Sequence, residues 1–132
     1  MGKFDFNISD DFIKQLGNLS DVDRIAPMMI DEAIPILESN VKKEASKYKR
    51  TGDMVNSIKR TKAKVSKYGG HFASVRPTGT DRKGVRNMEK MVYMEYGAHG
   101  STPHPVLTKS INDSESDVLD KMQEVFDREV SK

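Results

Sequence analysis

The chain has 132 residues, a length typical of one domain with one hydrophobic core, so we expect residues 1–132 to form a single domain. Hydrophobic residues make up 36% and charged residues 32% of the chain, and no stretch approaches the roughly 18 to 20 consecutive apolar residues of a membrane helix. The start has no apolar core typical of a signal peptide. From the lack of such stretches we expect a soluble protein without a membrane partner. Because cysteine is absent, disulfides, thiolate zinc sites and cysteine nucleophiles are excluded.

The net charge of +2 conceals a segregation of sign along the chain. Residues 1–40 carry three basic and eight acidic side chains, a net charge of −5. Residues 41–67 carry ten basic and two acidic ones, a net charge of +8, and residues 113–132 return to −4. Such a chain can satisfy its own charges, pair with copies of itself, or present its basic segment to nucleic acid.

Two helices are predicted in the first third of the chain. Residues 4–16 read as a short first element, in which Ser9 is the N-cap of a helix, and residues 1–8 are expected to be flexible. A long helix is predicted from about residue 20 to residue 48, with Pro27 in its first turn and a kink at Pro35. Its apolar stripe has helical spacing and consists of Ile30, Ile34, Leu37, Val41, Ala45 and Tyr48.

A short helix and a basic hairpin are predicted next. Residues 51–58 read as a helix capped by Thr51 or Asp53, with Met54, Val55 and Ile58 as its only anchors. From residue 59 the side chains alternate, with Thr61, Ala63 and Val65 on the buried face of a strand. Paired glycines then predict a hairpin turn over residues 68–71, and residues 72–77 return as the second strand with Phe72 or Ala73 and Val75 buried.

The last third is predicted to be helical around two loops. Residues 78–85 have the composition of an exposed, flexible loop. Residues 87–96 suit a helix or a strand, and we favour a helix that ends at Gly97. After a loop, Pro105 opens one helix, and a capping pattern at residues 114–117 opens a terminal amphipathic one. The terminal helix would bury Val118, Leu119, Met122, Val125, Phe126 and Val130.

Few residues suggest catalysis or metal binding. His71, His99 and His104 could supply three metal ligands, although Glu95 is the only acid close to the last two in the sequence. Asp53 and Glu95 could be posited as a carboxylate pair, but a capping role accounts for Asp53 equally well. We therefore predict a protein that is not an enzyme and uses no cofactor. A basic strip, composed of Lys59, Arg60, Lys62, Lys64 and Lys67, could instead hold a nucleic-acid backbone or an acidic partner.

Three segments in a fixed order carry a resemblance. The first is Thr-Gly-Asp-Met-Val-Asn-Ser-Ile at residues 51–58, and after the basic hairpin comes Tyr-Met-Glu-Tyr-Gly at residues 93–97. A proline-containing loop then leads into Pro-Val-Leu at residues 105–107. In this order they resemble the neck or tail-completion proteins of tailed bacteriophages, over about residues 20–130. The residues that carry the resemblance are Thr51, Gly52, Asp53, Ser57, Ile58, Tyr93, Glu95, Tyr96, Gly97, Pro103, Pro105 and Leu107.

The chain departs from the family pattern at three places. Ala98 stands where threonine is common, Val106 where phenylalanine is common, and Lys109 or Ser110 where a second proline often falls. The resemblance implies an α+β fold, with helices packed on a small antiparallel sheet. It also implies a non-enzymatic phage or prophage protein of the head–tail junction, assembled in the bacterial host cytoplasm and carried in the virion. Its partners would be copies of itself in a ring, other neck, connector or tail proteins, and DNA in the lumen. The alternative is a small nucleic-acid-binding protein that uses residues 59–67.

Overall fold

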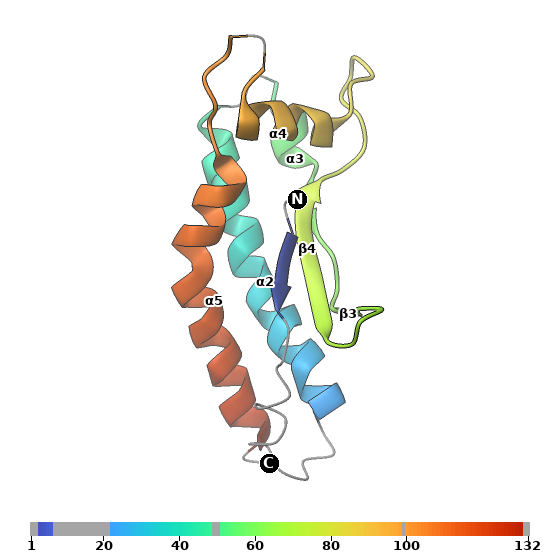
Figure 1. The fold of residues 1–132 in the computed structure, drawn as a ribbon, viewed down its shortest axis with the longest axis vertical. Coiled ribbons are helices and arrows are strands. Elements are labelled where there is room, and N and C mark those ends of the chain that lie inside the picture. The colour runs from blue at the N-terminus through green and yellow to red at the C-terminus, as the bar shows by residue number, and fades with distance from the viewer. Residues whose placement is uncertain (1–2, 7–21, 49–50, 99, 131–132) are drawn as a thin grey trace.

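The computed structural model describes residues 3–6, 22–48, 51–98 and 100–130, and its architecture is α+β as predicted (Figure 1). Two long helices run side by side along the long axis, and a small antiparallel sheet lies on one flank of them. In chain order the elements are β1 (Lys3–Phe6), α2 (Val22–Ser46), α3 (Asp53–Asn56), β2 (Ile58–Arg60), β3 (Lys64–Val65), β4 (His71–Pro77), α4 (Asn87–Tyr96) and α5 (Val106–Val130).

The core lies mainly between α2 and α5. The predicted stripe of α2 is buried from Ile30 to Ala45, whereas Tyr48 lies beyond the helix and is 40% exposed. Val118, Met122 and Val125 of α5 pack against that stripe. Packing of two amphipathic faces is the main stabilising contribution to helices of this kind, because helix propensity alone is weak.

Polar contacts fix how α2 and α5 lie against each other. The buried carboxylate of Glu129 accepts a hydrogen bond from Arg24 at 2.7 Å and another from Arg128 at 3.0 Å. Arg128 also pairs with Glu32, which raises the pKa of the guanidinium and lowers the pKa of the carboxyl. This ion-pair network ties the C-terminal end of α5 to the N-terminal half of α2.

The structure corrects the predicted limits of both long helices. Pro27 does not lie in the first turn, because α2 begins five residues earlier at Val22. α2 is one continuous element through both of its prolines, and a bend at Pro35 stays a prediction. α5 is likewise one helix of 25 residues, so the capping pattern at Ser114 does not start a new one. Ser114 is instead buried and accepts a hydrogen bond from Asn40 of α2.

The surface of α5 also differs in part from the predicted one. Leu119 is 45% exposed and Val130 is 38% exposed, although both belonged to the predicted buried stripe. The apolar residues of a helix bury only where an opposing element covers them. α2 covers the arc that contains Val118 and Met122, and Leu119 falls outside that arc.

β4 is the central strand of the sheet. β1 pairs with β4 along one edge, and β2 and β3 pair with it along the other, all of them antiparallel. The buried side chains of β4 are Ala73, Val75 and Pro77, which lie on the inner face toward α2. The prediction that Ala73 and Val75 are buried is therefore confirmed.

A bulge divides the first arm of the predicted hairpin into β2 and β3. Arg60 pairs with Val75 and Lys64 pairs with Phe72, so three residues of one arm face two residues of β4. An extra residue inverts the alternation of faces that a regular strand would have. The simple alternation predicted for residues 61–65 is consequently wrong. Val65 lies opposite His71, on the face of the sheet that holds Ala73, but at the end of β3 it is 71% exposed.

α2 satisfies the edge of the sheet at this bulge. The backbone N–H of Ala63 donates to Asp31 at 2.7 Å, and the backbone N–H of Arg60 donates to Glu38 at 2.8 Å. Two carboxylates of one helix thus replace the partners that an edge strand leaves open. The turn after β3 matches its prediction, because Gly69 and Gly70 both have positive φ.

The N-terminal prediction is wrong where the structure describes it. Residues 3–6 form strand β1, whose Phe4 pairs with Ala73, whereas the first element over residues 4–16 is predicted to be helical; the flexibility expected for residues 1–8 stays a prediction. A short strand has too few residues for its two-residue alternation to be distinguished from the start of a helical pattern. The strand that pairs with β1 also lies about 70 residues away in the sequence. The remainder of that predicted helix, residues 7–16, lies outside the described residues. In the described part of the chain, the helices are too short or too polar to cross a bilayer.

Candidate functional site

Residues 93–107 include the last residues of α4, the loop after it and the first residues of α5, and we call this segment the α4–α5 joint. The prediction that residues 87–96 form a helix is confirmed with the same bounds. Glu95, near the end of α4, is buried, and its carboxylate reaches the first turn of α5. It accepts hydrogen bonds from the N–H of Leu107 at 2.7 Å, from the N–H of Thr108 at 3.1 Å and from the Thr108 hydroxyl at 2.6 Å.

This contact caps one helix with a carboxylate from another. The first N–H groups of a helix have no partner within it, and the helix dipole favours a negative charge there. Pro105 precedes α5, and its carbonyl accepts the N–H of Lys109 at 2.9 Å. Glu95 therefore holds the start of α5 against the end of α4, a role that the sequence analysis did not assign to it.

Gly97 sets the path of the chain out of α4. It has φ 80° and ψ 162°, a region essentially restricted to glycine, and its N–H donates to the carbonyl of Tyr93 at 2.8 Å. A Cβ atom at this position would lie 2.8 Å from the carbonyl oxygen of Ser101 and 3.1 Å from Cγ of Pro103. The helix stop predicted at Gly97 is confirmed, and the loop folds back closely over it.

The two tyrosines of the joint, Tyr93 and Tyr96, are exposed. Tyr93 is 50% and Tyr96 is 60% exposed, whereas Glu95 and Met91 fill the interior positions of α4. The Tyr93 hydroxyl donates to Glu89 at 2.8 Å, and this hydrogen bond raises the pKa of the phenol. Aromatic side chains that remain exposed beside a cleft are available for contacts with a partner.

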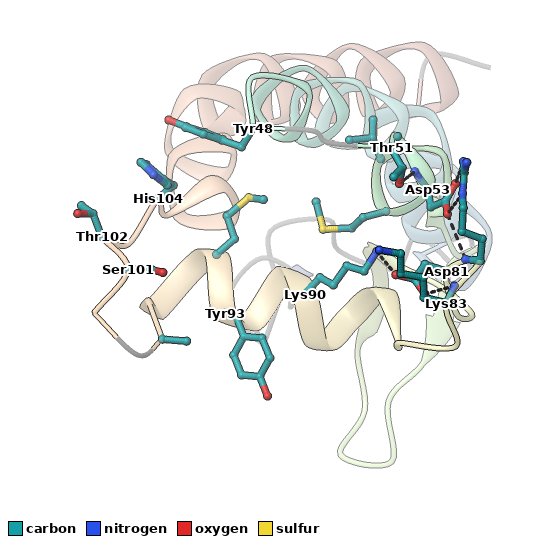
Figure 2. A pocket seen from close by; sticks show the side chains of 16 residues that line it. Tyr48, Thr51, Asp53, Asp81, Lys83, Lys90, Tyr93, Ser101, Thr102 and His104 are labelled. Carbon is teal, nitrogen blue, oxygen red and sulfur yellow. Dashed lines mark hydrogen bonds and ion pairs between the residues drawn. The ribbon is translucent and has the colours of Figure 1, made fainter.

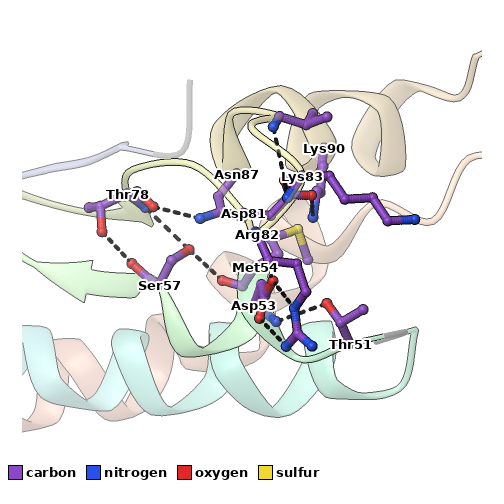
Figure 3. Close-up of polar contacts among 11 residues, drawn as sticks. Thr51, Asp53, Met54, Ser57, Thr78, Asp81, Arg82, Lys83, Asn87 and Lys90 are labelled. Atoms are coloured by element: carbon purple, nitrogen blue, oxygen red, sulfur yellow. Dashed lines mark hydrogen bonds and ion pairs between the residues drawn. The ribbon is translucent and has the colours of Figure 1, made fainter.

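The prediction that Asp53 caps α3 is wrong. The N-cap position is Gly52, which makes no side-chain cap, and the Thr51 hydroxyl oxygen accepts the N–H of Asp53 at 3.3 Å. The Asp53 carboxylate instead accepts three hydrogen bonds from Arg82, from its backbone N–H at 3.1 Å and from its guanidinium at 2.8 Å and 2.7 Å (Figure 3). These bonds lower the pKa of Asp53 far below its usual range.

The Asp53–Arg82 contacts attach the loop of residues 78–86 to α3, and further contacts attach it to α4. Asp81 pairs with Lys90 of α4 and accepts the N–H groups of Lys83 and Val85 within its own loop, which lowers its pKa. Asn87 donates from its side chain to the carbonyl of Thr78 at 2.8 Å. The flexibility expected for residues 78–85 stays a prediction, and these contacts oppose it.

Ser57 and Ile58 link α3 to the sheet. The carbonyl of Ser57 accepts both the N–H and the hydroxyl of Thr78, at 3.0 Å and 2.8 Å (Figure 3). Ile58 is 1% exposed and packs in the core with Met54 and Val55, so the three predicted anchors are confirmed. Ile58 begins β2 instead of ending a helix, because α3 stops at Asn56.

A cleft of about 790 Å³ opens between α3, α4 and the joint (Figure 2). Its walls include Thr51, Asp53 and Tyr93, so the first two segments of the resemblance border it, and His104 lines it directly before the third segment. The two described carboxylates on its wall, Asp53 and Asp81, are each engaged by a cation. Asp53 and Glu95 do not act as a pair, because the first binds Arg82 and the second caps α5.

The histidines that could have formed a metal site are separated. His71 lies 3.8 Å from Asp23 at the start of α2, and His104 stacks on Tyr48 just beyond the end of α2, with ring centroids 4.2 Å apart. A helix of 25 residues is about 37 Å long, so these two histidines lie at opposite ends of the molecule. His99 lies outside the described residues, which hold no cluster of three potential ligands.

The basic strip is divided between two faces of the sheet. Arg60 turns toward α2 and pairs with Glu38 at 3.0 Å, whereas the cross-strand pairing places Lys59 and Lys64 on the outer face. Lys62 is exposed at the bulge, and Lys67 lies over the Tyr68 ring, 4.9 Å from its centroid. The sequence analysis missed a further member, Arg76 of β4, which is exposed directly opposite Lys59.

Comparisons of this chain with protein-family models, with curated proteins and with solved structures find no match. The resemblance is carried by residues 51–58, 93–97 and 105–107, and the function is inferred from it together with the geometry. These three segments meet at one end of the molecule, where Glu95 and Gly97 hold the joint and Asp53 holds the adjacent loop.

Proposed function

We propose that this protein is a structural subunit of the head–tail junction of a tailed bacteriophage or prophage, where copies of it form a ring that connects head and tail. One observation carries the proposal. The three segments that resemble the neck and tail-completion family, distant in the sequence, meet at one end of the molecule, because α3 packs against α4 and Glu95 of the second segment binds Leu107 of the third. Asp53 and Gly97 make structural contacts in the same region. Motif residues that position helices and loops suit a protein whose function is assembly.

Further features support a subunit that works in contact with others. Tyr93 and Tyr96 are exposed at the joint, and Lys59, Lys64 and Arg76 are exposed on the outer face of the sheet. Exposed aromatic and arginine side chains are enriched at protein interfaces. In the proposed setting the partners are other copies, adjacent neck, connector or tail proteins and, for lysines that face a lumen, DNA.

The proposal is tested on particles made by the genome that encodes this chain. Purified particles are analysed by mass spectrometry, and an epitope tag on the C-terminus is located by gold-labelled electron microscopy. We expect the chain in stoichiometric amounts and the label at the head–tail junction. Deletion of the gene should yield separate heads and tails that rejoin when purified protein is added. Particles that are complete and infectious without the chain would exclude the proposal.

A small nucleic-acid-binding protein is the second candidate, and the exposed cations of the sheet favour it. Lysine and arginine side chains that neutralise phosphates release counterions, so affinity then falls steeply with salt. Fluorescence anisotropy with labelled duplex DNA across a salt series separates the two functions. Tight binding with a steep salt slope, lost when Lys59 and Lys64 become glutamate, would favour this candidate. Weak binding that does not depend on those lysines would exclude it.

A further inference from the structure

The outer face of the sheet carries a repulsive arrangement of charge. Lys59 and Arg76 are directly opposite each other on β2 and β4, and like charges in such a pair destabilise a sheet. Lys64 adds a third exposed cation on the same face, because the extra residue of the bulge places its side chain on the outer face. In the described part of the chain, no carboxylate lies within 4 Å of any of the three.

The exposed side of α5 carries the complementary charge. Its acidic residues recur at intervals of four and three, which places them in one stripe about 80° wide on a helix of 3.6 residues per turn. Asp113 and Glu124 each have a lysine neighbour on the same helix, whereas Asp117 and Asp120 have no cation within 4 Å among the described residues. All members of this acidic stripe are exposed, and they are Asp113, Asp117, Asp120, Glu124 and Asp127.

The two charged surfaces match in length but lie on different sides of the molecule. The seven residues of β4 span about 23 Å, and the stripe from Asp113 to Asp127 spans about 21 Å of helix. α2 packs against both β4 and α5 and separates them (Figure 1). One copy therefore cannot bring its own stripe onto its own sheet, but a second copy can.

We propose that the acidic stripe of α5 docks on the outer face of the sheet of a second copy of this chain. The contact is heterologous, because different surfaces of the two copies meet, and repetition of such a contact gives a ring or a filament. This inference rests on the proposed function, since it assigns the surfaces through which subunits of the junction would join.

The size of the sheet makes the contact weak in isolation. Three strand positions about 4.8 Å apart and a length of about 23 Å give a footprint of roughly 330 Å² per copy. A standard stable interface buries about 800 Å² per partner. The contact must therefore be concentration-dependent and sensitive to salt, and in a closed ring each subunit makes it twice.

Charge exchange between the two surfaces tests the proposal. The sheet variant carries Lys59→Glu, Lys64→Glu and Arg76→Glu, and the helix variant carries Asp117→Lys, Asp120→Lys and Glu124→Lys. All changed residues are exposed, and circular dichroism with thermal unfolding checks that each variant keeps the wild-type fold. A control variant with the same change of net charge carries Lys43→Glu, Lys83→Glu and Arg86→Glu, away from the sheet.

Sedimentation velocity at low salt and at about 1 M salt, where the Debye length is about 3 Å, gives the readout. The wild type and the control should associate at millimolar concentration in low salt, and each single-surface variant should remain monomeric. An equimolar mixture of the two variants should associate again, as should one chain with all six changes. A wild type that stays monomeric, a control that loses association, or a mixture without rescue would each overturn the inference.

The outcomes also separate this inference from the proposed function. Failed rescue together with the chain at the head–tail junction would reject the docking surfaces and leave the function standing. Rescue together with complete particles that lack the chain would reject the function and leave the docking surfaces standing. If the sheet variant instead loses duplex DNA while self-association is unchanged, the sheet face binds nucleic acid and the docking inference is overturned.

Discussion

Replacing Gly97 by valine should damage the fold more than any change of the neighbouring histidines. The backbone at φ 80° and ψ 162° costs a residue with a side chain about 1 to 3 kcal/mol. The new Cβ would also lie 2.8 Å from the backbone oxygen of Ser101, and relieving such a clash costs about another 1 to 3 kcal/mol. We therefore expect a loss of roughly 2 to 6 kcal/mol from a total stability of about 5 to 15 kcal/mol.

Urea denaturation followed by circular dichroism measures this loss. The comparison variant carries His99→Gln and His104→Gln, in which the Tyr48–His104 stack is weakened at a cost of about 1 kcal/mol or less. Gly100→Ala is a matched control, because Gly100 has φ 82° but no atom within 4 Å of a Cβ, so it isolates backbone strain from the clash. Equal stability of the Gly97→Val and double-histidine variants would refute the role assigned to the joint.

Two further contacts give measurable predictions. Glu95→Ala should lower the free energy of unfolding by about 1 to 3 kcal/mol, because the N–H of Leu107 is left buried without a partner. Glu95→Gln should lower the free energy of unfolding by less, and an equal loss in both variants would contradict the capping role. Asp53→Asn should speed hydrogen exchange of the backbone N–H of Arg82, whereas unchanged protection would mean that the loop does not depend on that ion pair. The pKa of Asp53 is depressed in the folded state, so its contribution to stability is complete above the ordinary pKa near 3.8 and is lost as the pH falls below it. An NMR titration of the Asp53 carboxyl carbon should show a midpoint well below 3.8, and a midpoint at that value would refute the pairing.

The helices were predictable where their apolar period was long. The stripe from Ile30 to Ala45 follows from spacing alone, because an amphipathic period identifies the face that will be buried. The spacing of residues 87–96 suits a helix or a strand, and the stop signal at Gly97 favours the helix that the structure shows. The stop at Gly97 also follows from its residue type. By contrast, Ser114 looks like a cap in the sequence and is an interior residue of α5, because Asn40 of α2 supplies its hydrogen bond.

The contacts that build the site could not be read from the sequence because they join distant residues. Asp53 and Glu95 both occupy positions where a local role is plausible, and both act on residues much further along the chain, Arg82 and Leu107. Arg76 joined the basic face only through the strand register. The bulge between Arg60 and Lys64 set that register, and no single residue in the segment marks it.

The most direct test of the central claim is a cryo-electron microscopy reconstruction of the head–tail junction in particles produced by the genome that encodes this chain. The account predicts a ring in which every subunit shows two antiparallel helices about 37 Å long, matching α2 and α5, beside a small sheet. A junction whose density is fully explained by other proteins, with no subunit of this shape, would contradict it.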